Sequence, residues 1–328
     1  MVTDRPLRIV YFGTPDFAVP SLRHLLDSRH SVVALVSQPD RPRGRGHHLV
    51  PTATKALAVT RDVPVFQPER IRDEGFLRSI ADLNVDLGVV AAYGKILPEA
   101  LLHIPRLGMI NVHASLLPRW RGAAPVHRAV IAGDDQTGVT IMRVVKELDA
   151  GPMFAIVRRT IDPDDTSVEV ERDLAERGGM LLLDVVDQMA AGTARETPQD
   201  ESAVTYASKI TKIEGAVDWA LPAERLHNLV RGLQPWPLVS ARLGGSRVLI
   251  HRTEVLSAVT PDKPGTIVRA EADRLEVAAG DGHVLRLLVL QPEGKRAMKA
   301  REFLAGRHVA PGMRLERDLL PPKPGEGG

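Results

Sequence analysis

The sequence predicts an α/β fold in its first half, a doubly wound and mainly parallel sheet, and a small antiparallel β-barrel in its last third. In the first half, near-continuous apolar segments with strand character alternate with segments of helical periodicity up to about residue 132. Such strands are typical of a parallel sheet that helices cover on both faces. In the last third, short strand candidates are separated by glycine and proline. That spacing favours a small barrel.

Each element follows from its own pattern. Buried strands are predicted at residues 7–13, 31–37, 63–67, 86–93 and 108–114, with helices at 16–28, 51–61, 74–83 and 123–132. Strand candidates at 137–145 and 153–161 lie on either side of a Leu-Asp-Ala-Gly turn. They predict a segment that resembles a β-hairpin. A long amphipathic helix is predicted at 166–191, capped by Thr166 or Ser167 and stopped by Gly192.

The second half is organised differently. Residues 192–205 are polar and predict a linker. After it come a short helix at 223–233 and strands at 240–243, 247–255, 265–270, 274–278 and 284–291. The predicted domains are therefore 1–191 and 206–320, joined by the linker 192–205 and followed by a flexible Pro/Gly-rich tail at 321–328.

Composition excludes several classes of site. The chain has no cysteine, so it has no disulfide, thiolate metal site, iron–sulfur cluster or cysteine nucleophile. The start of the chain lacks a basic-then-apolar signal pattern, and no apolar run approaches the roughly 20 residues of a membrane span. We therefore expect a cytoplasmic protein with no membrane partner. The net charge of +2 says little about partners, so any nucleic-acid site must be argued locally.

The first strand-to-helix turn argues against nucleotide cofactors. It reads Gly13-Thr14-Pro15-Asp16-Phe17, without the G-x-G-x-x-G pattern of dinucleotide sites, and no Walker A sequence occurs. Parallel sheets bind ligands beyond the carboxyl ends of their strands, so the chemistry is expected at that edge.

A dense polar cluster follows the strand at 108–114. Side chains alternate along a strand, so Asn111 and His113 share one face at its end. Asp149 lies in the Leu-Asp-Ala-Gly turn of the predicted hairpin-like segment. A neutral donor, an imidazole and a carboxylate suit acyl transfer, because the amide can donate to an oxyanion and the carboxylate favours the imidazolium. No activated nucleophile is evident, so direct attack by a substrate amine is simplest. A purely structural Asn and His pair is the alternative.

Several motifs resemble the folate-dependent formyltransferases. They are NVHASLLPRWRGAAP at 111–125, TGVTIM at 137–142 and LDAGPM at 148–153. FGTPDFA at 12–18, QPDRPRGRG at 38–46 and AYGKILP at 92–98 narrow the resemblance to the branch that acts on methionyl-tRNA. The resemblance spans roughly residues 7–317 and implies a formyltransferase domain with an OB-like C-terminal barrel that binds tRNA.

The resemblance also implies roles for single residues. Asn111, His113 and Asp149 match the family's catalytic residues, and Ser115, Leu116, Leu117 and Pro118 match its tetrahydrofolate-binding loop. The implied formyl donor is 10-formyltetrahydrofolate. The implied acceptor is the α-amine of methionyl initiator tRNA, formylated for translation initiation. Phe17 either belongs to the core or lines the methionine pocket.

A basic loop is the candidate contact to tRNA. Between residues 41 and 61 there are five basic residues and no acidic one. Glycines would keep this loop flexible enough to order on an RNA end. The resemblance assigns Arg41, Arg43 and Arg45 to the acceptor stem, with Arg45 foremost, whereas composition alone also fits a solvated loop. Residues 206–320, with 18 basic and 13 acidic residues, suggest a further contact to the RNA backbone.

Other assignments stay open. Lys95, Ile96 and Leu97 would wall the folate pocket or belong to the core, and Arg119 and Arg121 would meet folate, phosphate or neighbouring acids. His47 and His48 have no further ligands nearby, so no metal is predicted. A monomer is expected. The alternatives are a formyltransferase for a small amine, such as an amino sugar nucleotide or glycinamide ribonucleotide, and a non-catalytic RNA-binding protein.

Overall fold

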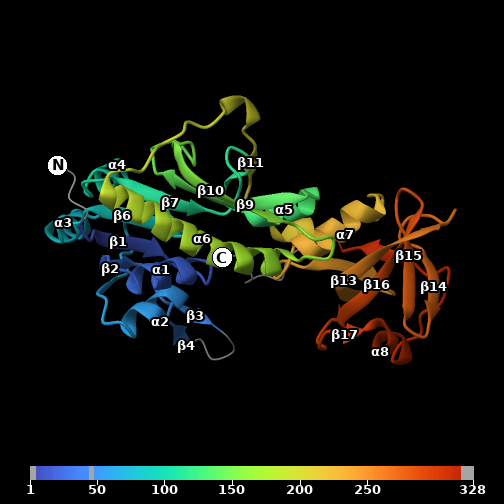
Figure 1. Cartoon of the computed structure of the whole chain (residues 1–328). Coiled ribbons are helices and arrows are strands. Elements are labelled where there is room, and N and C mark those ends of the chain that lie inside the picture. The colour runs from blue at the N-terminus through green and yellow to red at the C-terminus, as the bar shows by residue number, and fades with distance from the viewer. Residues whose placement is uncertain (1–4, 44–47, 319–328) are drawn as a thin grey trace. The chain divides into compact units, whose positions relative to one another are not determined.

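The structure is a computed structural model that describes residues 5–43 and 48–318 (Figure 1). Contacts divide the chain into two units. Unit 1 comprises Met1–Pro125, Gln136–Thr160 and Glu171–Ala207. Unit 2 comprises Val126–Asp135, Ile161–Val170 and Ser208–Gly328. Each unit therefore contains several separate segments of the chain. The predicted domain boundaries at 191 and 206 stay a prediction.

The elements of unit 1 follow the predicted alternation. Its strands are β1 (Arg8–Gly13), β2 (Ser31–Val36), β3 (Arg41–Arg43), β4 (His48–Val50), β5 (Val65–Phe66), β6 (Leu87–Ala91), β7 (Met109–His113), β8 (Arg121–Gly122), β9 (Gln136–Arg143), β10 (Met153–Thr160) and β11 (Tyr206–Ala207). Its helices are α1 (Ala18–Leu26), α2 (Ala53–Val59), α3 (Glu74–Asp82), α4 (Glu99–Leu102), most of α6 (Ser167–Ala191) and η1 (Glu201–Ala203).

The main sheet of unit 1 has seven strands in the order β10-β9-β7-β6-β1-β2-β5. The five strands β5, β2, β1, β6 and β7 run parallel, and β9 is antiparallel to both of its neighbours. This arrangement confirms the predicted doubly wound, mainly parallel sheet. The parallel strands place their carboxyl ends at one edge, where the first βα turn and the end of β7 also lie.

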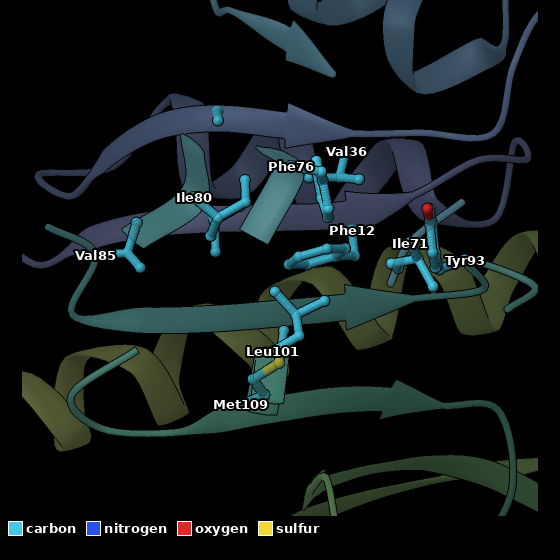
Figure 2. Packing of buried hydrophobic residues seen from close by; sticks show 11 residues of the cluster. Phe12, Val36, Ile71, Phe76, Ile80, Val85, Tyr93, Leu101 and Met109 are labelled. Carbon is cyan, nitrogen blue, oxygen red and sulfur yellow. The ribbon is translucent and has the colours of Figure 1, made fainter. Parts of the chain in front are cut away.

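Helices cover both faces of this sheet. On one face, Phe76 and Ile80 of α3 are buried in the same hydrophobic cluster as Phe12 and Met109 (Figure 2). Burying such a side chain contributes about 1.5–3 kcal/mol. On the other face α6 packs closely, since a Cβ at Gly178 would lie 3.0 Å from Val112. Alternation along β7 therefore puts Asn111 and His113 on the face of Met109, the face that α3 covers.

Unit 2 holds the predicted barrel. Its elements are most of α5 (Pro125–Ala132), η2 (Lys212–Gly215), α7 (Ala223–Gly232), β12 (Val239–Leu243), β13 (Ser246–Val259), β14 (Ile267–Glu271), β15 (Arg274–Ala278), β16 (His283–Pro292), β17 (Met298–Lys299), α8 (Ala300–Ala305) and β18 (Leu315–Arg317). The sheet follows the order β14-β15-β16-β13-β12-β18. A bridge between Thr266 and Arg314 joins its two ends, so the sheet curls on itself as an OB-like barrel.

The structure differs from the sequence-based expectation at the basic loop. There β3 pairs antiparallel with β4, with Arg41 opposite Val50 and Arg43 opposite His48. The flanking apolar residues Leu49 and Val50 have strand character, which the glycines between the two strands obscured in the sequence. Arg45 lies outside the described residues, as does the predicted tail 321–328.

The predicted linker 192–205 is attached to unit 1. Thr197 forms an antiparallel bridge with Met153 at the start of β10. Gln199 is buried, and Tyr206 and Ala207 of β11 pair in parallel with Arg121 and Gly122 of β8. Of its polar side chains, Gln199 donates to the backbone of Asp149 and Gly151, and Glu201 pairs with Arg121.

Candidate active site

His113 stands at the carboxyl end of β7 between two acceptors. Its Nε2 lies 2.9 Å from the backbone oxygen of Trp120, and its Nδ1 lies 3.7 Å from Oδ2 of Asp149. A backbone oxygen only accepts, so Nε2 carries a proton and donates it to Trp120. A second proton on Nδ1 would face the carboxylate. The ring is buried, so these two contacts take the place of solvent at its nitrogens.

The loop that follows β7 holds the carboxylate of Asp149 in place. Its Oδ2 accepts a hydrogen bond of 2.9 Å from the backbone N–H of Gly122. Its backbone is left-handed, with φ of +48°, which is unusual for a residue other than glycine. Among the described residues, no hydrogen bond reaches the other oxygen, Oδ1. That oxygen is available to a ligand or a water molecule.

Asn111 is the third member of the predicted trio. It lies on the same face of β7 as His113, about 6.6 Å away along the strand. The side chain is half-buried, and within residues 5–43 and 48–318 its amide has no protein partner. An amide in this position can donate to a ligand oxygen. The structure thus brings together Asn111, His113 and Asp149, which are 38 residues apart in sequence from first to last.

The predicted folate loop is shaped by internal hydrogen bonds. The hydroxyl of Ser115, which is fully buried, donates to the backbone oxygen of Arg119 at 2.7 Å. Thr140 of β9 donates to the oxygen of Ser115 and accepts from the N–H of Leu117. Leu117 is buried and is joined to Pro118 by a cis peptide bond. Half-buried Leu116 and Pro118 remain as the residues of this loop that offer apolar surface.

Sequence reasoning missed a buried pair of polar side chains behind the Asp149 turn. Arg121 donates to Oε1 of Gln199, and Gln199 donates to the backbone oxygens of Asp149 and Gly151. Arg121 also pairs with Glu201, so of the roles considered for it the structure shows the pairing with a neighbouring acid. Gln199 sits in the polar segment after α6, where no periodicity or motif marks it.

A second polar network occupies the same edge of the sheet, at the base of the β3–β4 hairpin. The Lys55 ammonium contacts Oδ2 of Asp40 at 2.5 Å and Oε1 of Gln67 at 2.7 Å. Burial alone would raise the pKa of Asp40, but hydrogen bonds from Lys55 and Gln67 hold it below its ordinary 3.8. Gln67 also lines a shallow pocket with Phe66, Glu69 and Arg70.

The other residues that were predicted to contact substrates lie in different segments of the chain from the trio. Phe17 is buried where α1 begins, directly after the end of β1. Arg41 begins β3 and is exposed, whereas the side chain of Arg43 is outside what the structure describes. Lys95 donates to the backbone oxygens of Pro68 and Glu69, which leaves its neighbour Ile96 strongly exposed.

Comparison with known proteins decides the family. Residues 7–186, more than half of the chain, match the formyl transferase family, and residues 209–308 match the formyl transferase C-terminal domain. The chain belongs to the formyl transferase family. The motif-based resemblance is thereby confirmed at the level of the family.

Solved structures share the formyl transferase fold. WlaRD, a sugar 3N-formyl transferase solved in the presence of dTDP and 5-N-formyl-THF, is 13% identical with a TM-score of 0.65 and matches over 88% of this chain and 99% of that chain. An N-formyltransferase from Helicobacter canadensis, in complex with folinic acid and dTDP-3-aminofucose, is 14% identical with a TM-score of 0.64, covering 87% and 99%.

A third relative is larger than this formyl transferase. HypX from Aquifex aeolicus, in complex with tetrahydrofolic acid, is 15% identical with a TM-score of 0.58. The match covers 91% of this chain and 47% of that one. At these identities the three likenesses establish the fold.

The described parts of this formyl transferase hold neither a metal-binding cluster nor a membrane-spanning helix. Over residues 5–43 and 48–318, no three or more His, Asp or Glu side chains gather in a way that would hold a metal ion. In the same residues, no helix has both the length and the apolar character that a bilayer crossing requires.

Proposed function

We propose that this formyl transferase moves the formyl group of 10-formyltetrahydrofolate to the α-amine of methionyl initiator tRNA, giving N-formylmethionyl-tRNA. The observation that carries the chemistry is the grouping of Asn111, His113 and Asp149 at the carboxyl edge of the sheet, with His113 Nδ1 3.7 Å from Asp149. The family supports a folate donor, as do structures of similar fold that were solved in the presence of 5-N-formyl-THF or in complex with folinic acid or tetrahydrofolic acid.

The residues at this edge fit a folate. Half-buried Leu116 and Pro118 and exposed Ile96 offer apolar surface to a flat ring, and the Asn111 amide has an unused donor among the described residues. When bound, 10-formyltetrahydrofolate supplies an activated formyl group for an amine to attack. The loop would be ready for it, because Thr140 already fixes the backbone of Ser115 and Leu117.

Each member of the trio has a separate task in this proposal. Asn111 donates a hydrogen bond to the formyl oxygen, on which negative charge develops as the amine attacks. His113, with both ring nitrogens facing protein acceptors, stabilises that charge as an imidazolium cation. Asp149 keeps the cation in place with Oδ2 and takes the proton lost by the amine on Oδ1, directly or through a water molecule. The bond between the formyl carbon and N10 then breaks, the proton passes to N10, and tetrahydrofolate leaves.

The tRNA acceptor rests on charge and on the motif resemblance. The hairpin of β3 and β4 carries Arg41 and Arg43 at the edge of the sheet that holds the site. Unit 2 adds the basic C-terminal barrel. A formyltransferase for a small amine needs neither of these basic surfaces, although it would share the catalytic trio.

The experiment that tests the proposal compares acceptors of different chemistry. Radiolabelled formyl transfer from 10-formyltetrahydrofolate is measured with methionyl initiator tRNA, with a dTDP-linked amino sugar and with glycinamide ribonucleotide. Rapid transfer to the tRNA and none to the small amines is expected. Transfer to a small amine alone would replace the acceptor in the proposal, and transfer to none would make the RNA-binding alternative the better one.

A further inference from the structure

A buried glutamine lies behind the carboxylate of the candidate site. Nε2 of Gln199 donates two hydrogen bonds of 2.8 Å, one to the backbone oxygen of Asp149 and one to that of Gly151. Oε1 of the same amide accepts from Nε of Arg121 at 3.0 Å and from Nη2 at 2.8 Å. Both donors and the acceptor of Gln199 are therefore fully used.

Burial makes this amide a firm support. Gln199 is 9% exposed and Arg121 is 3% exposed. Nη2 of Arg121 also donates to Oε1 of Glu201 at 2.7 Å, and Nη1 donates to Oε2 of Glu201 at 3.3 Å. Hydrogen bonds donated by a charged group are stronger than those between neutral groups. Arg121 thus fixes the orientation of the Gln199 amide, and the amide in turn fixes two carbonyl groups on either side of Ala150.

The turn that carries Asp149 depends on outside support. Its own backbone bond, from the Ala150 N–H to the oxygen of Glu147, is long at 3.5 Å. Asp149 is in a left-handed conformation, and a Cβ at Gly151 would lie 2.0 Å from the backbone oxygen of Arg143. The turn is strained and tightly packed at once, so a small loss of support would shift the carboxylate.

We propose that Gln199, oriented by Arg121, is a positioning residue that sets the distance between Asp149 and His113 and thereby the rate of formyl transfer. This inference rests on the proposed function and adds a residue that touches no substrate. Gln199 acts on the carboxylate through its turn, so its loss lowers kcat while the binding of folate and tRNA is retained. A misplacement of about 1 Å at a reacting group costs on the order of 10²-fold in rate.

The test uses a nearly isosteric substitution. Gln199→Glu keeps the acceptor for Arg121 but removes the two donors to the turn. We expect kcat for formyl transfer to fall about 10- to 100-fold with both KM values nearly unchanged. Gln188→Glu, an exposed change near the end of α6, is the matched control and should keep the wild-type kcat.

A double-mutant cycle separates positioning from general damage. If Gln199 acts through Asp149, then adding Gln199→Glu to Asp149→Asn lowers kcat no further than Asp149→Asn alone. Independent, multiplicative losses in the double variant would overturn the inference. Failure of the wild-type chain to formylate methionyl-tRNA would instead overturn the proposed acceptor.

Hydrogen exchange gives a second readout that needs no activity. In Gln199→Glu the amides of residues 147–151 should exchange about threefold faster or more than in the wild type, while those of β7 are unchanged. Equal exchange in this turn in both proteins would contradict the positioning role. Faster exchange throughout unit 1 would also contradict it, because that result shows global destabilisation.

Discussion

Asn111 has no protein partner for its amide among the described residues, so the proposed mechanism uses this amide as a donor to the formyl oxygen. Replacing Asn111 by alanine should lower kcat by about 10²- to 10³-fold, the usual loss for one oxyanion donor. The fold should be unaffected, because no protein hydrogen bond is lost. Steady-state formyl transfer measures the effect, with Gln136→Ala, at the exposed first residue of β9, as the control. Near-normal turnover of Asn111→Ala would remove this residue from the mechanism.

Gly122 connects backbone geometry to the carboxylate. Its φ is +120°, and a Cβ there would lie 2.8 Å from the oxygen of Ala207. Gly122→Ala should therefore push the N–H away from Asp149 and reduce both kcat and stability, the latter by about 1–3 kcal/mol. Urea unfolding measures the stability. Gly294 also has a positive φ but open space around it. Gly294→Ala therefore measures the loss of stability that backbone conformation alone causes. Equal losses in the two variants would contradict the clash.

At this scale the sequence predicted the trio but not its support. Asn111 and His113 were identifiable because strand alternation and the following loop mark them, and Asp149 because it stands in a short turn. Gln199 carries no such mark, since its role depends on a fold that returns residue 199 to residues 149 and 151. Arg121 belongs to a basic motif that would be expected at the surface. It is buried because its guanidinium group bonds to Gln199 and Glu201.

At the scale of elements, Asp86 ties the amino ends of three parallel strands together. It lies just before β6 and is 4% exposed. It accepts from the Arg8 N–H of β1 at 3.0 Å and from Arg106, which precedes β7, at 3.0 Å. Burial alone would raise the pKa of Asp86, but these hydrogen bonds and the charges of Arg5 and Arg106 hold it below its ordinary 3.8.

This lowered pKa predicts a dependence of stability on pH. The unfolded chain binds a proton at Asp86 more readily than the folded chain, so the stabilisation is complete above about pH 4 and is lost as the pH falls through the folded pKa. Asp86→Asn should cost about 1–3 kcal/mol at pH 7. Urea unfolding at pH 7, 4 and 3 should show the two proteins converging in acid. A constant difference at all three values would exclude Asp86 as the source.

Most elements of both units were predicted because periodicity and turn residues mark them. The strands β1, β2, β6 and β7 are near-continuous apolar runs, which is the pattern that a sheet buried on both faces requires. The hairpin of β3 and β4 was missed because its pairing is short and surrounds glycines. The helix α8 was missed because six residues show too little periodicity to be distinguished.

At the scale of the whole molecule, the proposed RNA partner predicts a response to salt. Neutralised phosphates release counterions, so tRNA affinity should fall steeply between about 50 and 200 mM salt while the KM for folate changes little. Lys299→Ala combined with Arg301→Ala, two exposed residues at the start of α8, should lower the slope of log Kd against log salt by about 1–2. Tryptophan fluorescence titration with tRNA measures it. An unchanged slope would exclude this end of the barrel from the RNA contact.

The proposed function joins a formyl transferase site to an RNA acceptor, and one assay tests both parts. Initial rates of formyl transfer from 10-formyltetrahydrofolate are measured for methionyl initiator tRNA, methionyl elongator tRNA and free methionine at equal concentrations. We expect efficient transfer to the initiator tRNA, much slower transfer to the elongator tRNA and none to methionine. Equal rates with all three, or transfer to none of them, would contradict it.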